Sequence, residues 1–201
     1  VEKTVIGSIM ESLVLDSASE RDFTRLKDIF ANPALQMASF TITEKGYAVT
    51  DTKGRTLPAL QSDYEKGPDQ PDSYLGKVMS LLYHRFSNGR CPIALVSMDN
   101  CSHNGDKLQS AILSFADAWC ERGLADKAFQ AYVRDQSKVS FPWTMIDKIT
   151  PRPDAAVSAM LSQDGMENPD AIVTSKNTYI APFVNAEECE YLIIEDAFPN
   201  G

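Results

Sequence analysis

Residues 93–105 constrain the fold of this chain more than any other segment. Residues 93–97 form an apolar, β-branched run after Pro92, which is the pattern of a fully buried strand. The next stretch, 99–105, is rich in Asp, Asn, Ser, His and Gly, and residues 106–120 then carry apolar side chains at helical spacing. A buried strand, a polar loop and an amphipathic helix in this order predict one crossover unit of a parallel sheet.

Strand-like and helical segments alternate along the rest of the chain, which predicts an α/β fold with a mainly parallel sheet and flanking helices. Residues 51–72 are dense in Asp, Lys, Gly and Pro, and we expect a solvated loop there. Helices are expected at residues 17–30, 73–86, 124–134 and 154–161, strands at 4–15, 35–43, 171–184 and 191–195, and an extended segment at 139–151.

Composition excludes several classes of partner. The 201 residues carry a formal net charge of −9 with scattered Lys and Arg, which argues against a nucleic-acid backbone as ligand. No apolar run approaches the roughly 20 residues of a membrane helix, and no signal peptide is visible at residues 1–4. The four cysteines are far apart, which favours reduced thiols in a cytoplasmic protein.

Common catalytic motifs are missing. The sequence has no G-x-S-x-G nucleophile motif, no phosphate-binding P-loop and no G-x-G-x-x-G dinucleotide fingerprint. A metal site at Asp99, Cys101 and His103 is conceivable, but a metal requires three or four converging ligands and we expect none here. The polar stretch 99–105 remains the candidate site, because ligands of open α/β sheets bind at the carboxyl ends of strands. Turn and helix-capping roles explain the same residue types equally well.

Four sequence blocks, in this order and spread over nearly the whole chain, carry a resemblance to a known family. The blocks are residues 41–47 (TITEKGY), 97–100 (SMDN) with Asn104 and Gly105, 141–142 (FP) with 145–151 (MIDKITP), and 194–196 (IED) with 198–201 (FPNG). Together they resemble the polyol-specific long-chain dehydrogenases, the family of mannitol 2-dehydrogenase and fructuronate reductase.

The resemblance implies a metal-independent enzyme that uses NAD or NADP to interconvert a secondary alcohol and a ketone on a sugar polyol or hexuronate. It implies that residues 1–201 are the later part of a Rossmann-like domain that lacks its first βα unit, with a C-terminal helical domain outside this chain. The family's catalytic lysine belongs to a K-x-x-x-x-N-x-x-H motif. Asn100 and His103 mimic the end of that motif, but Leu95 occupies the lysine position. The chain alone is therefore expected to have no turnover.

Six residues acquire expected roles through the resemblance. Asn100 matches an asparagine that holds the reacting oxygen, and Asp147 matches an aspartate at the substrate end of the cleft. Ile146 would pack against the nicotinamide. The cofactor cleft is expected to be lined by Thr43, Glu44 and Lys45 at the end of a strand.

The structural alternatives are that Asn100 caps a turn, that Asp147 pairs with Lys148 or Arg152, and that Ile146 is core.

The chain departs from the family pattern in one segment that bears on the substrate. The usual E-P-F-x-x-W is replaced by Ala181-Pro182-Phe183 and a longer segment 184–190. Overall likeness favours mannonate and fructuronate over mannitol and fructose. The second hypothesis is a non-catalytic α/β module that binds a small metabolite, and the oligomeric state is left open.

Overall fold

A computed structural model of the chain describes residues 2–175 and 177–200. The chain divides into two compact units, and each is described by itself: the first comprises residues 2–144 with 194–200, and the second comprises residues 145–193. No helix within the described residues is both long enough and apolar enough to span a membrane.

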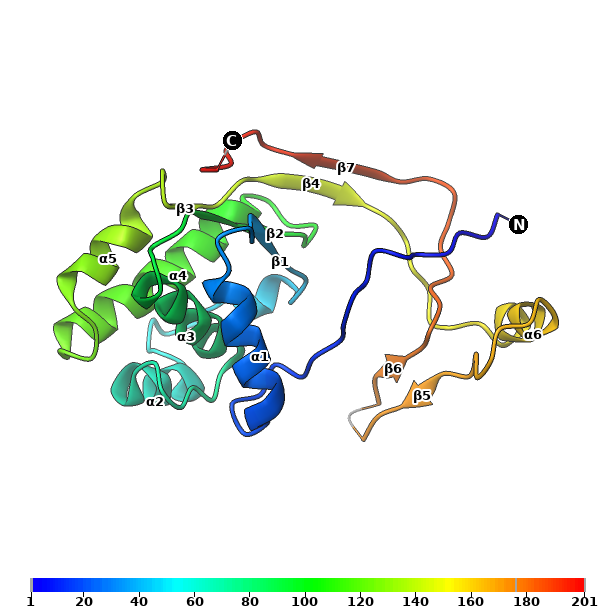
Figure 1. Cartoon of the computed structure of the whole chain (residues 1–201), viewed down its shortest axis with the longest axis horizontal. Helices are drawn as coiled ribbons and strands as arrows, with labels where there is room; N and C mark the ends of the chain where they lie inside the picture. The colour runs from blue at the N-terminus through cyan, green and yellow to red at the C-terminus, as the bar shows by residue number, and fades with distance from the viewer. Residues whose placement is uncertain (1, 176, 201) are drawn as a thin grey trace. The chain divides into compact units, whose positions relative to one another are not determined.

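A three-stranded parallel sheet organises the first unit (Figure 1). Its strands are β1 (Met37–Phe40), β2 (Ile93–Ser97) and β3 (Val139–Ser140), in the order β1-β2-β3. Ala38 lies opposite Leu95, and Ile93 lies opposite Val139. All five residues of β2 are buried, as expected for a central strand that reads as a continuous apolar run. The predicted α/β fold with a parallel sheet is confirmed.

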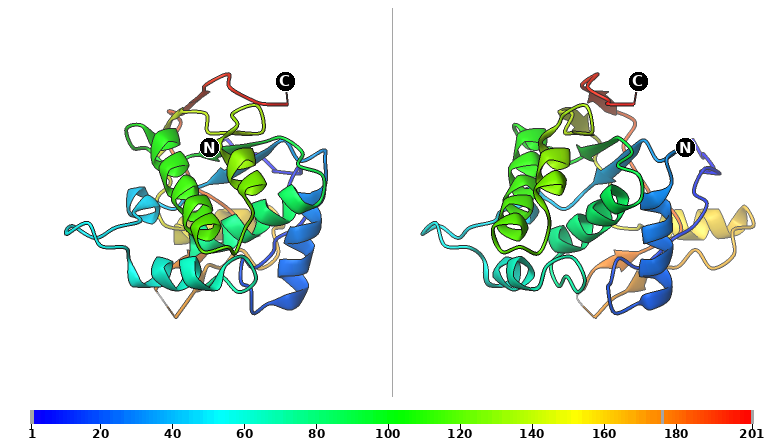
Figure 2. Two further views of the ribbon diagram at one scale, coloured as in Figure 1. Left: turned by 90° about the vertical axis from the view of Figure 1, so that its left-hand side faces the viewer. Right: turned by 60° about the vertical axis from the view of Figure 1, so that its left-hand side comes forward.

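Four amphipathic helices supply most of the helical side chains in the core of this unit: α1 (Glu20–Ala31), α3 (Tyr74–Ser87), α4 (Asn104–Glu121) and α5 (Lys127–Arg134). Helices α3, α4 and α5 lie together beside the sheet in Figures 1 and 2. Ser73 caps α3 by accepting from the Gly76 N–H, and Asp126 caps α5 by accepting from the Phe129 N–H. The largest fully buried side chains include Trp119, Phe115, Phe129, Met79, Leu82, Leu108 and Ile112.

Two expected segments differ from the structure. Residues 4–15 form no strand, and Val5 and Met10 are almost fully exposed, because the described chain offers this segment no strand to pair with. The supposed loop 51–72 contains helix α2 (Pro58–Lys66). Pro58 begins α2 at a position that tolerates proline, and Leu60 and Tyr64 are buried, so two core contacts decide the conformation of a polar segment.

The second unit is built from short elements. Strand β4 (Thr144–Asp147) pairs with β7 (Tyr191–Ile194), and α6 (Ala155–Gln163) begins at Asp154, whose carboxylate accepts from the N–H groups of Ala156 and Val157. The expected strand 171–184 is instead a short antiparallel pair, β5 (Ile172–Val173) with β6 (Tyr179–Ile180). The second unit keeps the expected order of helix and strands, but its elements are short.

Candidate functional site

The candidate site lies where the strands of the parallel sheet end. Strand β1 leads through residues 41–43 into the 3₁₀ helix η1 (Glu44–Tyr47), and β2 leads through residues 98–103 into α4. Parallel strands bring these carboxyl ends to one edge of the sheet, which is the edge where ligands of open α/β folds bind. We call residues 41–47 and 98–104 the carboxyl edge.

A buried carboxylate joins the two halves of the carboxyl edge. Asp99 accepts from the backbone N–H of Ile42 at 3.0 Å and from that of Thr43 at 2.9 Å. It also accepts a short hydrogen bond from the Tyr47 hydroxyl, which lies 2.7 Å from the Ser97 hydroxyl. Burial and then the hydrogen bond to Asp99 raise the pKa of the Tyr47 hydroxyl, so it stays a proton donor at neutral pH. Asp99 therefore fixes the turn that follows β1.

A buried amide makes the second connection. The Asn104 Nδ2 group donates to the Asp99 carbonyl at 3.1 Å and to the Thr144 Oγ1 at 2.8 Å. The Asn104 Oδ1 accepts from the Thr144 N–H at 3.1 Å, and the Thr144 hydroxyl donates to the Ser97 carbonyl at 2.6 Å. The amide satisfies the backbone groups of Thr144 as a neighbouring strand would, and so joins the start of α4 to the start of β4.

Close packing at Gly105 reinforces this connection. A Cβ atom at Gly105 would lie 2.5 Å from the Phe141 carbonyl oxygen and 2.6 Å from Cδ1 of Trp143. Only a residue without a side chain lets the first turn of α4 approach the backbone after β3 this closely.

Asn100 stands exposed between these two anchors. Its side chain makes no hydrogen bond to another described residue, so the alternative role as a turn cap is not realised. The neighbouring Cys101 is half-buried, and burial raises the pKa of its thiol, which keeps it protonated and uncharged at neutral pH. The amide of Asn100 is thus an exposed hydrogen-bonding group at the end of β2 with no partner among the described residues.

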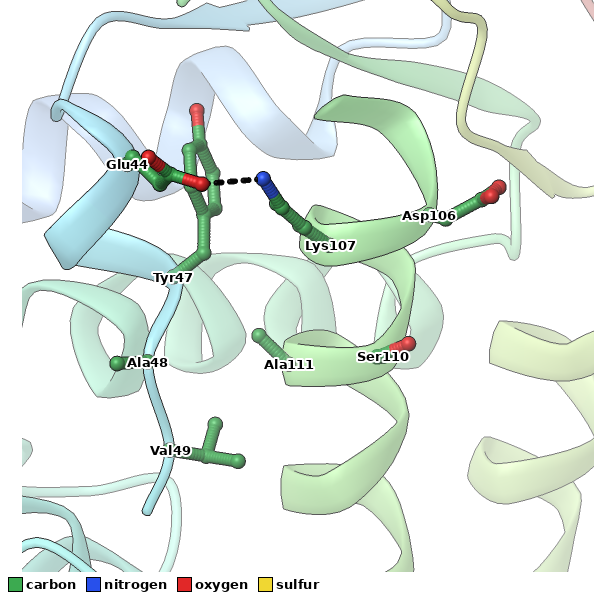
Figure 3. A pocket seen from close by; sticks show the side chains of 8 residues that line it. All are labelled: Glu44, Tyr47, Ala48, Val49, Asp106, Lys107, Ser110 and Ala111. Carbon is green, nitrogen blue, oxygen red and sulfur yellow. Dashed lines mark hydrogen bonds and ion pairs between the residues drawn. The ribbon is translucent and has the colours of Figure 1, made fainter. Parts of the chain in front are cut away.

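Thr43, Glu44 and Lys45 lie at the carboxyl edge but not on a strand, because β1 ends at Phe40. Glu44 pairs with Lys107 of α4 at 2.6 Å (Figure 3). The two side chains border a shallow hollow of about 390 Å³, lined also by Tyr47, Ala48, Val49, Asp106, Ser110 and Ala111. Lys45 is exposed, and Thr43 has a φ of 63°, which is unfavourable for a β-branched residue.

The His103 side chain contacts Trp143 and Asp106. Its ring meets the Trp143 ring edge-on with centroids 4.5 Å apart, and its Nδ1 lies 3.4 Å from the Asp106 carboxylate. Asp106 also accepts from the Trp143 indole N–H at 2.9 Å. The His103 side chain thus belongs to a surface cluster at the start of α4.

Ile146 and Asp147 lie on β4 in the second unit. Asp147 is exposed and forms no ion pair within the described chain; Lys148 pairs with Glu190 at 2.5 Å instead. Ile146 is half-buried and is absent from the hydrophobic core of the first unit. Neither of the structural alternatives expected for these two side chains is observed.

Sequence reasoning missed the residues that hold the site. Asp99, Asn104 and Tyr47 are buried and hydrogen-bonded, but the sequence analysis gave none of them a role in holding the site. One available signal was that Asp99 lies two residues after the buried run 93–97, where a polar side chain is drawn into the interior and must find partners.

Known proteins resemble this chain in sequence and in fold. The model of the "Mannitol dehydrogenase Rossmann domain" matches residues 4–200. The D-mannonate oxidoreductase of Thermotoga maritima is 49% identical over 200 residues, which are 100% of this chain and 36% of that protein. The D-mannonate oxidoreductase of Escherichia coli is 28% identical over 100% of this chain and 37% of its own length.

Two solved dehydrogenase structures have a fold similar to that of this chain. The Pseudomonas fluorescens mannitol 2-dehydrogenase, solved with NAD and D-mannitol, superimposes with a TM-score of 0.71 at 30% identity, over 98% of this chain and 36% of that chain. A D-sorbitol dehydrogenase in substrate-free form gives a TM-score of 0.69 at 26% identity, over 91% of this chain and 34% of that chain. The fold is Rossmann-like, and the chain spans about a third of the length of these relatives.

Proposed function

The chain belongs to the mannitol dehydrogenase Rossmann-domain family, and from this premise we propose that it is the later part of the nicotinamide-binding domain of a sugar-acid or polyol dehydrogenase. The observation that carries the proposal is the free, exposed amide of Asn100 at the carboxyl end of β2, between two buried anchors. In the proposed protein, a helical domain and the catalytic lysine lie outside these residues.

In this proposal Asn100 stabilises the reacting oxygen. Its amide N–H donates to the carbonyl oxygen of the substrate, which gains negative charge as the ketone is reduced. When bound, a reduced nicotinamide would supply the hydride, and the carbonyl carbon of the substrate would accept it. Because Asn100 makes no hydrogen bond to another described residue, its amide breaks none of these bonds when it binds this oxygen. The proton that the resulting alkoxide takes up comes from a general acid outside this chain, the protonated form of the proposed catalytic lysine, and residues 2–200 by themselves are expected to show no turnover.

The residues of the carboxyl edge fit one end of a dinucleotide. Thr43, Glu44 and Lys45 supply exposed polar groups next to the end of β2, as a cofactor cleft requires. Ile146 offers an apolar side chain for the nicotinamide face. The sequence contains no G-x-G-x-x-G, and in this proposal the glycine-rich pyrophosphate cradle lies outside this chain. The cofactor is NAD or NADP.

Asp147 is proposed to bind the substrate. Its carboxylate is exposed and unpaired among the described residues, and it can accept hydrogen bonds from polyol hydroxyls. The 49% identity to a D-mannonate oxidoreductase favours a mannonate or fructuronate substrate over mannitol or fructose.

An absorbance assay of the full-length protein that contains this chain tests the proposal. NADH and NADPH are each supplied with fructuronate, tagaturonate and fructose. We expect rapid oxidation of one reduced cofactor with fructuronate. Absence of oxidation with all three substrates, from a folded protein, would favour the small-metabolite-binding module instead.

The variant Asn100→Ala tests the residue assignment in the same assay. Loss of one oxyanion donor is expected to lower kcat by about 10²-fold or more. Asn88→Ala is the matched control, because Asn88 is an exposed asparagine at the end of α3, before β2 rather than after it. Equal activity of the two variants would remove Asn100 from the reaction.

A further inference from the structure

The segments that follow β1, β2 and β3 are joined by hydrogen bonds of two buried side chains, Asp99 and Asn104. Asp99 binds the turn after β1 through the N–H groups of Ile42 and Thr43, and Asn104 binds Thr144, the first residue of β4. The two are themselves linked, because the Asn104 amide donates to the Asp99 carbonyl. We call Asp99, Asn104 and the Tyr47 hydroxyl the strand-end latch.

The latch brackets Asn100 on both sides. Asn100 follows Asp99 directly, and only three residues separate it from Asn104. Met98 is held as well, since its backbone N–H donates to the Phe40 carbonyl at 2.7 Å. The exposed amide of Asn100 thus sits on a short turn whose two ends are fixed by buried hydrogen bonds.

Backbone strain at both ends of the latch points the same way. Thr43 has a φ of 63° and His103 has a φ of 54°, both in the left-handed region that non-glycine residues rarely adopt. Such conformations persist only where surrounding contacts impose them, and they are concentrated at functional sites. Asp99 binds the N–H of the strained Thr43, and Asn104 directly follows the strained His103.

We infer that Asp99 and Asn104 are positioning residues: they hold the turn that carries Asn100, and so set the place of its amide relative to Thr43 and Lys45. The inference rests on the proposed function, since it deepens the role given to Asn100. The latch does not touch the substrate in this scheme. It acts by reducing the number of places that the Asn100 amide can occupy, and misplacement by about 1 Å costs on the order of 10²-fold in rate.

A matched control exists within the chain. Asp63 is also a fully buried aspartate that accepts two consecutive backbone N–H groups, from Asp72 at 2.7 Å and from Ser73 at 2.8 Å. It lies in α2 and holds the start of α3, so it is not part of the carboxyl edge. Asp63→Asn and Asp99→Asn make the same chemical change in two similar settings with different neighbours.

The experiment compares these two variants in the full-length protein, with the cofactor and keto sugar that give turnover. Asp99→Asn is expected to lower kcat at least 10-fold. Because Asp99 also holds the N–H of Thr43, which is proposed to line the cofactor cleft, the KM for the reduced nicotinamide is expected to rise, but by a smaller factor. Asp63→Asn is expected to leave kcat within two-fold while lowering the unfolding midpoint. Tyr47→Phe removes one hydrogen bond of the latch, and we expect it to lower kcat two- to ten-fold. Because it is the milder change, it serves if Asp99→Asn does not fold.

Hydrogen exchange gives a second readout that does not need activity. Asp99→Asn should speed exchange of the amides of residues 42–43 and 100–103, whereas Asp63→Asn should speed that of residues 72–76. Unchanged exchange at 100–103 overturns the inference. So does a kcat for Asp99→Asn within two-fold of the parent when Asn100→Ala is impaired. No turnover by the parent protein is a different result: it overturns the proposed function.

Discussion

The two units of the chain differ in what holds them together. The first unit buries aromatic and aliphatic side chains from five helices and a sheet, whereas Pro169 is the single buried residue among the described residues of the second. Ile172 and Ile193 of the second unit are 65% and 61% exposed. Burial of apolar surface is the main stabilising contribution to folding. The comparison teaches that apolar residues stabilise a unit only where its helices and strands pack against one another and bury those side chains.

Polar interactions differ in the same way. Arg85 of the first unit is buried and donates to five backbone carbonyls, those of Phe30, Asn32, Leu35, Cys91 and Pro92. In the second unit, Arg152 is exposed and lies over the Tyr179 ring with its guanidinium carbon 5.0 Å from the centroid. An arginine surrounded by protein contributes to stability, while one screened by water contributes little.

The largest expected effect comes from truncating the core of the first unit. Phe115→Ala is expected to lower the free energy of unfolding by about 3–5 kcal/mol, because Phe115 is fully buried against Tyr64 and Trp119. Ile172→Ala should change it by less than about 0.5 kcal/mol. Urea unfolding followed by far-ultraviolet circular dichroism measures both, since Trp119 and Trp143 both lie in the first unit and their fluorescence would not report on the second. Equal losses would show that the second unit has a core after all.

The second prediction concerns the two arginines. Arg85→Met is expected to cost about 3 kcal/mol, because it leaves buried carbonyls without donors. Arg152→Met, which removes an exposed contact, should cost less than about 1 kcal/mol. The same urea titrations test this pair, and a cost for Arg152→Met as large as that for Arg85→Met would contradict the contrast.

The smallest effect is the response of the first unit to alkaline pH. Burial raises the pKa of Tyr132 to about 12 from its usual 10.0, and its hydroxyl donates to the Cys91 carbonyl at 2.8 Å. Between pH 10 and 12 the unfolded chain loses this proton while the folded chain keeps it, so stability falls as the pH rises. Tyr132→Phe should show a shallower fall over this range.

Unfolding of both proteins at pH 8 and at several values up to pH 12 gives the slopes. The offset at pH 8 measures the lost hydrogen bond, and the difference in slope isolates the titration. Parallel curves would mean that Tyr132 titrates alike in the folded and unfolded chain.

Local patterns were enough for the central part of the fold. The apolar run 93–97 and the helical spacing after it have only one arrangement that buries both, so β2 and α4 were predictable. The helix α3 was also predictable, since Ser73 provides a cap and its apolar residues recur at helical spacing. The carboxyl edge followed from these elements, because a parallel sheet brings its strand ends together.

Tertiary structure decided what depends on partners distant in sequence. Residues 4–15 have strand composition, but a strand forms only where another strand pairs with it. Helix α2 exists because Leu60 and Tyr64 reach the core across a stretch that is polar in sequence. The latch is of the same kind: Asp99 and Asn100 are adjacent and both polar, yet the backbone groups of Ile42 and Thr43, more than fifty residues away, select which of them is buried and which remains free. The sequence determined which polar groups lie at the carboxyl edge. Long-range hydrogen bonds decided that Asp99 is buried in a structural role and that Asn100 stays exposed for the proposed reaction.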